Sequence, residues 1–83
     1  MYEVLIKDKP KKFLKKLKSG ENKKIIEKLQ KLGANPQLGK RLSGRLHGLW
    51  KLRVDKYRIL YTIIEGKLLV IVVDIEHRKS VYE

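Results

Sequence analysis

The 83-residue sequence predicts a single α+β domain in which an N-terminal helix hairpin covers one face of a twisted antiparallel β-sheet. Two lysine-rich segments with helical spacing of their apolar residues occupy the first part of the chain. Segments with a period of two occupy the last part, and a glycine-containing stretch separates the halves. The predicted element order is β-α-α-β-β-β, in one domain over residues 1–83.

The N-terminal part predicts one strand and two helices. Residues 2–6 alternate apolar and polar side chains, which is typical of a short strand. A first helix over residues 8–18, capped by Asp8, should end at a Ser-Gly pair, and a second over 21–32 should end at Gly33. Each helix has a narrow apolar stripe, and the surface available for both stripes is a face of the sheet.

The C-terminal part predicts three strands joined by tight turns, over residues 50–54, 57–64 and 67–75. The run 68–73 is apolar at every position, which predicts a strand buried on both faces. This strand should therefore be central, with the N-terminal strand as one neighbour. The preceding segment, residues 33–48, has no sustained period and predicts a loop.

The first predicted hairpin gathers positive charge on one face of the sheet. Its strands are separated by two polar residues, so a turn there places Arg53 opposite Arg58. Lys51 shares this face because side chains alternate along a strand. The alternate positions, expected to face the helices, are Trp50, Leu52 and Ile59. Like charges opposite one another are unfavourable, which favours an anionic partner; the alternative is a solvated outer face.

Composition narrows the class of that partner. The net charge of +12 favours nucleic acid or another acidic surface. Eleven of the sixteen lysines lie in residues 1–31, whereas all five arginines lie between 41 and 78. Because the guanidinium group matches phosphate geometry, the arginine-bearing half is the predicted site. Lys40, Arg41, Arg45 and His47 are expected at the rim of a basic groove, and His47 is interpreted as a surface or hydrogen-bonded histidine.

Several classes of site are not expected from this sequence. Without cysteine the chain has no disulfide or zinc-thiolate site, which fits a reducing compartment. No apolar run reaches the length of a membrane span, and the N-terminus lacks the order of a signal peptide, so we predict a cytoplasmic protein. No carboxylate–histidine cluster has ligand spacing, and neither a metal nor another cofactor is expected.

Residues 35–83 resemble a known family. The motifs GLWKLRV, YRILY and HRKSVYE, at this spacing, are similar to those of the RelE/ParE toxin superfamily and, within it, the RelE branch. The resemblance implies a toxin of a type II toxin–antitoxin system, a ribosome-dependent endoribonuclease that cleaves messenger RNA in the A site and inhibits translation. It also implies a cognate RelB-type antitoxin, with the toxin monomeric when free and heteromeric with the antitoxin.

The same resemblance assigns site residues. Those that fall on the family's active-site positions are Lys51, Arg53, Arg58, Arg78 and Tyr82. Binding of RNA and the ribosome is assigned to Lys40, Arg41 and Arg45. The implied reaction is a metal-independent attack of the 2′-OH on phosphate, which needs a base, an acid and donors to the phosphorane.

Two features keep other interpretations open. Several relatives have lysine where this chain has Arg53, which is a poor general acid because guanidinium does not lose its proton. Glu76 and His77 offer a replacement pair, with His77 as a possible acid or base. The alternative functions are a ParE-like poison of DNA gyrase on the same scaffold, and a basic RNA-binding module without turnover.

Overall fold

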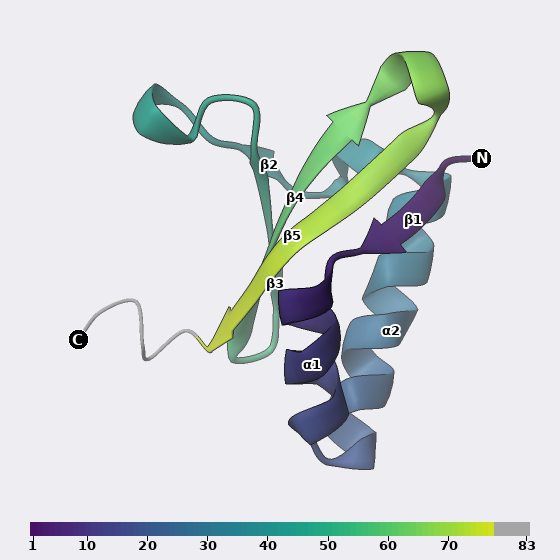
Figure 1. Ribbon diagram of the computed structural model, residues 1–83, viewed down its shortest axis with the longest axis vertical. Helices are drawn as coiled ribbons and strands as arrows, with labels where there is room; N and C mark the ends of the chain where they lie inside the picture. Colours follow the sequence, from purple (N-terminus) through teal and green to yellow (C-terminus); the bar gives the residue numbers. More distant parts are fainter. Residues whose placement is uncertain (78–83) are drawn as a thin grey trace.

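The molecule has a layer of two helices on one face of a five-stranded sheet (Figure 1). The computed structural model describes residues 1–77. The strands and helices are β1 (Glu3–Ile6), α1 (Asp8–Lys16), α2 (Ser19–Ala34), β2 (Lys40–Arg41), β3 (Trp50–Val54), β4 (Tyr57–Ile64) and β5 (Leu69–His77). Three short 3-10 turns are η1 (Pro36–Leu38), η2 (Gly44–Leu46) and η3 (Glu65–Lys67). The predicted α+β class is confirmed, and β2 is an additional strand. In the described part of the chain no helix is long and apolar enough to cross a membrane.

The strand order is β1-β5-β4-β3-β2, so the last strand is central and lies beside the first, as predicted. The β1–β5 pair is parallel, which differs from the antiparallel sheet expected from the sequence; the other three pairs are antiparallel. The helix hairpin returns the chain to the start of β1, where the Tyr2 amide donates to the Gly33 carbonyl at 2.8 Å. Strands β3 and β5 run in the same direction because two antiparallel pairings separate them, and this is also the direction of β1.

The helix boundaries differ from prediction for local reasons. The first helix ends at Lys16 and the second begins at Ser19, so the Ser-Gly pair opens α2. Asp8 is the first helical residue and makes no capping hydrogen bond; as an acid in the first turn it stabilises the positive helix end. Gly33, predicted to end α2, lies inside it. A Cβ there would lie 3.0 Å from the Tyr2 carbonyl oxygen, so glycine allows α2 to approach the N-terminal segment.

The core lies between the helices and one face of the sheet. Its buried members from the helices are Leu14, Ile25, Leu29 and Leu32. From the sheet they are Leu52, Val54, Tyr57, Ile59, Tyr61, Val70, Val72 and Ile75. Alternation along β3 and β4 turns the neighbouring residues to the other face, as predicted, and Trp50 packs against the core while half-buried. Each large side chain that is fully buried contributes about 1.5–3 kcal/mol to folding.

The expectation that residues 68–73 are buried on both faces is wrong. Val70 and Val72 are fully buried, but Ile71 and Val73 are half-buried. Leu68 lies outside β5 and is 53% exposed. Within residues 1–77 the helices cover only one face of the sheet, so an apolar strand still has a solvent side (Figure 1).

A buried tyrosine connects the β3–β4 hairpin to α2. Tyr57 donates a hydrogen bond to the Glu21 carboxylate, and Lys56 Nζ lies 3.9 Å from the same group. The Phe13 ring meets the Tyr57 ring edge-on at 5.8 Å. Burial, followed by the hydrogen bond and the charge of Glu21, raises the pKa of Tyr57 to about 12.

We expect Tyr57 to link folding stability to alkaline pH. The pKa is higher in the folded than in the unfolded chain, where it is near 10.0, so the contribution is complete below pH 10 and is lost as pH rises through about 12. Tyr57→Phe should lower stability at neutral pH by about 1–3 kcal/mol and flatten its decrease in this window. Urea unfolding at a series of pH values measures both effects. Tyr2→Phe, at a half-exposed tyrosine, is the control, and an unchanged slope in Tyr57→Phe would contradict the linkage.

Candidate functional site

The pairing of β3 with β4 brings three predicted site residues together. Arg53 lies opposite Arg58 and Lys51 lies opposite Leu60, which is the predicted register. Directly opposed residues point to the same side of a sheet, so Lys51, Arg53 and Arg58 share the face that the helices leave uncovered. Lys51 and Arg58 are half-buried and Arg53 is exposed. We call these three residues the cationic face.

The short strand β2, which the sequence analysis missed, divides the predicted groove residues. Lys40 lies opposite Lys51, so it extends the cationic face. Arg41 lies opposite Trp50 and therefore points to the other side of the sheet. Arg45 lies in η2 and is exposed. Of these three residues, only Lys40 therefore extends the cationic face.

A hollow lies at the outer edge of this face, where β2 begins beside β3. It is lined by Leu38, Gly39, Lys40, Lys51, Leu52 and Arg53. Three of its six lining residues are cationic, and none of the ion pairs within residues 1–77 involves them. The hollow therefore combines uncompensated positive charge with access from solvent, which suits an anionic ligand.

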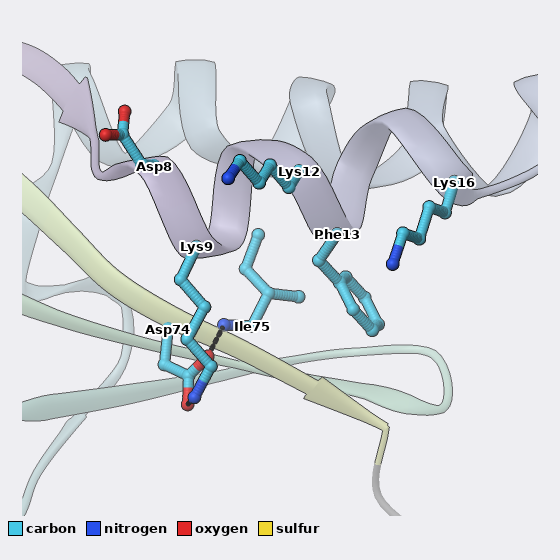
Figure 2. Close-up of a pocket in the computed structure, with 7 residues that line it drawn as sticks. All are labelled: Asp8, Lys9, Lys12, Phe13, Lys16, Asp74 and Ile75. Atoms are coloured by element: carbon cyan, nitrogen blue, oxygen red, sulfur yellow. Dashed lines mark hydrogen bonds and ion pairs between the residues drawn. The ribbon is translucent and has the colours of Figure 1, made fainter.

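Two acidic residues of β5 lie in line with the cations of β3 and β4, at the third position of a row of paired residues that crosses the three strands. Glu76 lies opposite Arg58, and Asp74 lies opposite Leu60, the partner of Lys51. Asp74 is engaged by Lys9 of α1 at 3.4 Å. Figure 2 shows Lys9 reaching from α1 to Asp74 beside a groove that Lys12, Phe13 and Lys16 also line. In the sequence Glu76 stands out only as a neighbour of His77, and the register across β3, β4 and β5 places it in line with Arg58 and Arg53.

The two members of the Glu76–His77 pair lie on opposite faces of β5. His77 is opposite Tyr57, and its ring meets the Tyr57 ring edge-on at 5.4 Å on the helix side. Glu76 is opposite Arg58 on the cationic face. Consecutive residues of a strand point in opposite directions, so the pair cannot act on one phosphate as neighbours.

Two predicted site residues, Arg78 and Tyr82, lie outside the described residues. Within residues 1–77 no three His, Asp or Glu side chains come close enough together to hold a metal ion.

A buried tyrosine fixes the chain segment that carries Lys40. The Tyr61 hydroxyl donates to the Pro36 carbonyl at 2.8 Å and accepts from the Gly39 amide at 3.0 Å. Burial raises the pKa of Tyr61, and the hydrogen bond from Gly39 opposes this. A Cβ on Gly39 would lie 2.4 Å from the Lys51 carbonyl oxygen, so glycine is needed for the close approach.

Comparison with known proteins identifies the family. The family model described as the ParE toxin of the type II toxin–antitoxin system parDE matches residues 4–82. The chain belongs to the RelE/ParE family of type II toxins.

Individual relatives of this toxin carry RelE names. A putative toxin RelE4 of Methanocaldococcus jannaschii is 31% identical over 87 residues, covering 100% of this chain and 93% of that protein. A chain of the RelBE2 toxin–antitoxin complex from Mycobacterium tuberculosis is 28% identical, with a TM-score of 0.84 and coverage of 93% and 91% of the two chains. The fold is also that of a chain in the archaeal RelE–RelB complex of Pyrococcus horikoshii, at 21% identity, a TM-score of 0.80 and coverage of 93% and 94%.

We expect Gly39→Ala to destabilise the toxin. The new methyl group would contact the Lys51 carbonyl and lie 2.7 Å from the Tyr61 hydroxyl, and neither backbone nor buried ring can yield easily. The cost should be about 1–3 kcal/mol, measured by urea unfolding. Gly20→Ala is the matched control, because nothing lies within 4 Å of a Cβ there and alanine favours a helix. Equal stability of the two variants would contradict the close approach at Gly39.

Proposed function

We propose that this toxin is an endoribonuclease that cleaves messenger RNA in the ribosomal A site and thereby inhibits translation. The observation that carries the proposal is the cationic face, Lys51, Arg53 and Arg58 on the side of the sheet that the helices leave open. Lys51 and Arg53 line a solvent-accessible hollow together with Lys40, and this concentration of positive charge favours a phosphodiester ligand. The RelE names of the relatives support the same activity.

The proposed reaction is a transesterification within the RNA strand. The 2′-oxygen attacks the adjacent phosphorus while the bond from phosphorus to the 5′-oxygen breaks, which leaves a 2′,3′-cyclic phosphate and a 5′-hydroxyl. A base accepts the 2′-OH proton, and an acid supplies a proton to the leaving oxygen. Arg58 and Arg78 supply charge-assisted hydrogen bonds to the phosphorane, and Arg53 adds positive charge. No metal takes part in this scheme.

Proton transfer falls to groups other than the arginines, because guanidinium stays protonated. Among the described residues beside Arg58, Lys51 and Glu76 are the groups able to exchange a proton. Tyr82 is proposed to stack on a base or orient the 2′-OH. His77, with its ring against Tyr57, supports the hairpin in this scheme instead of reaching the phosphate.

The proposed partners are the ribosome, its message and an antitoxin. Lys40 beside the cationic face, Arg45 in the exposed turn η2 and Arg41 on the other side of β2 are proposed to contact RNA. The RelE relatives of solved structure include chains in complexes named RelBE and RelE–RelB. We therefore propose a RelB-type antitoxin that covers the basic surface, a free toxin that is monomeric, and a cytoplasmic location where ribosomes are present.

A second candidate function is poisoning of DNA gyrase. The observation that favours it is the ParE description of the matching family model. Such an inhibitor binds a protein and has no need for Lys51, Arg53 and Arg58 on one face. Growth arrest without cleavage of translated message, together with inhibited supercoiling, would favour this function over the ribonuclease.

We expect Arg58→Ala to abolish most message cleavage without unfolding the toxin. Loss of one donor to the phosphorane costs about 10²–10³ in rate, and removing Arg58 also relieves its repulsion with Arg53. Primer extension on translated message measures cleavage, and thermal unfolding checks the fold. Arg78→Ala should behave similarly. The control is Lys67→Ala, which removes an exposed cation in η3, away from the cationic face. Full activity of folded Arg58→Ala would refute the assignment.

We also expect cleavage to require the ribosome. The cationic face is open, and in the described part of the chain no second wall faces it to orient a free RNA strand. Positioning by the ribosome can then supply several kcal/mol of the barrier. The measurement compares cleavage of one message with and without translating ribosomes. Equal rates would contradict ribosome dependence.

A further inference from the structure

A second pocket lies on the other side of β2 from Lys40, at the end of the sheet where β3 begins and β4 ends. The loop between β2 and β3 projects beyond the sheet here, away from the helices (Figure 1). Its lining includes Gln37, Arg41, His47, Trp50 and Glu65. We call these five residues the end pocket; the active-site assignments include none of them.

One wall of the end pocket is a layered aromatic and cationic surface. The ring of Trp50 stacks on that of Tyr61, with centroids 6.1 Å apart and planes 23° apart. The Arg41 guanidinium lies over Trp50, 5.9 Å from the ring centroid. Trp50 remains half-buried and lines the pocket, so an aromatic surface is accessible from it. Trp and Arg planes are surfaces on which unpaired RNA bases stack.

The wall is held in place before any ligand binds. Tyr61, beneath Trp50, is fixed by its hydrogen bonds with Pro36 and Gly39. The loop is closed by a hydrogen bond from the Leu42 amide to the Leu49 carbonyl at 2.9 Å. Thr62 of β4 also donates from Oγ1 to the Gly48 carbonyl at 2.9 Å. A preformed pocket loses less conformational entropy when a ligand binds.

Three polar side chains of the end pocket make no hydrogen bond or ion pair within residues 1–77. Gln37, His47 and Glu65 are exposed, and their side chains take part in none of the hydrogen bonds or ion pairs of residues 1–77. Arg41 and Glu65 line one pocket without forming an ion pair. The pocket therefore offers a carboxylate acceptor, guanidinium donors, and an amide and an imidazole capable of both, next to a stacking surface.

We propose that the end pocket binds an unpaired guanine of single-stranded RNA. Guanine presents two adjacent donors, N1–H and the N2 amino group, which match the two oxygens of the Glu65 carboxylate. Its O6 and N7 accept from Arg41 or Gln37. Adenine, cytosine and uracil each present a single donor group on this edge. The inference rests on the proposed function in so far as RNA is the ligand, and it adds base selectivity outside the cationic face.

Trp50 provides a direct probe because it is the protein's only tryptophan. The experiment titrates the free toxin with uncleavable 2′-O-methyl pentanucleotides, four uridines around a central guanine or adenine. Raised salt suppresses nonspecific binding by a protein of charge +12. We expect saturable quenching of Trp50 fluorescence, with about tenfold tighter binding of the guanine oligonucleotide. No quenching, or equal affinity for both, would overturn the proposal.

Variants locate the effect in the pocket. Glu65→Gln should remove the preference for guanine, and Arg41→Lys, which keeps the charge but loses the planar group, should weaken binding of both oligonucleotides. Lys67→Ala is the matched control, because Lys67 lies in the same turn as Glu65 without lining the pocket. A guanine preference that survives Glu65→Gln, or is lost in Lys67→Ala, would overturn the assignment to Glu65.

The source of the guanine is distinguished on the ribosome. If the pocket binds a base of the message, Glu65→Gln should change which codons are cut. If it binds a base of ribosomal RNA, the same variant should lower cleavage equally at all codons. Failure of the ribonuclease proposal gives a different result, because cleavage would be absent while the free toxin still bound guanine. Cleavage without quenching of Trp50 would reject the pocket proposal alone.

Discussion

The register between β3 and β4 decides which side chains of this toxin meet, because a shift of one residue would move every side chain of a strand to the other face. The turn at Asp55 and Lys56 sets that register, with Asp55 in the left-handed region at φ 56. Aspartate tolerates this backbone conformation better than most residues. From this turn follow both the apolar face against the helices and the opposed pair of Arg53 and Arg58.

The core holds the cations together against their repulsion. Leu52 and Ile59 are directly opposed and buried, and they belong to the same two strands as Arg53 and Arg58. A slip that separated the arginines would expose these apolar side chains and bury cations, at a far larger cost than the repulsion of partly solvated charges. Glu76 at the end of the row offsets part of the repulsion. The basic surface is thus stabilised by what lies on the opposite face of the sheet.

The edge strand β2 presents a different side chain on each face of the sheet. It is only two residues long, yet it turns Lys40 toward the cationic face and Arg41 toward the end pocket. Tyr61 positions both residues by binding the segment between α2 and β2 through Pro36 and Gly39. The two sides of β2 therefore differ, with cations on one side and an aromatic and guanidinium surface on the other.

Local patterns in the sequence determined the helix hairpin, the period-two alternation, the hairpin register and the cationic face of Lys51, Arg53 and Arg58. Each depends on residues close together in the chain, where turn length and hydrophobic period constrain the geometry. The motifs that indicate the family are also local stretches of sequence. Only the tertiary structure decided the parallel β1–β5 pair, the strand β2, and the placement of Glu76 on the cationic face with His77 on the opposite face. These depend on pairing between distant segments and on a register shift in β4–β5 near Leu60, and no local propensity encodes which edge a remote strand will join.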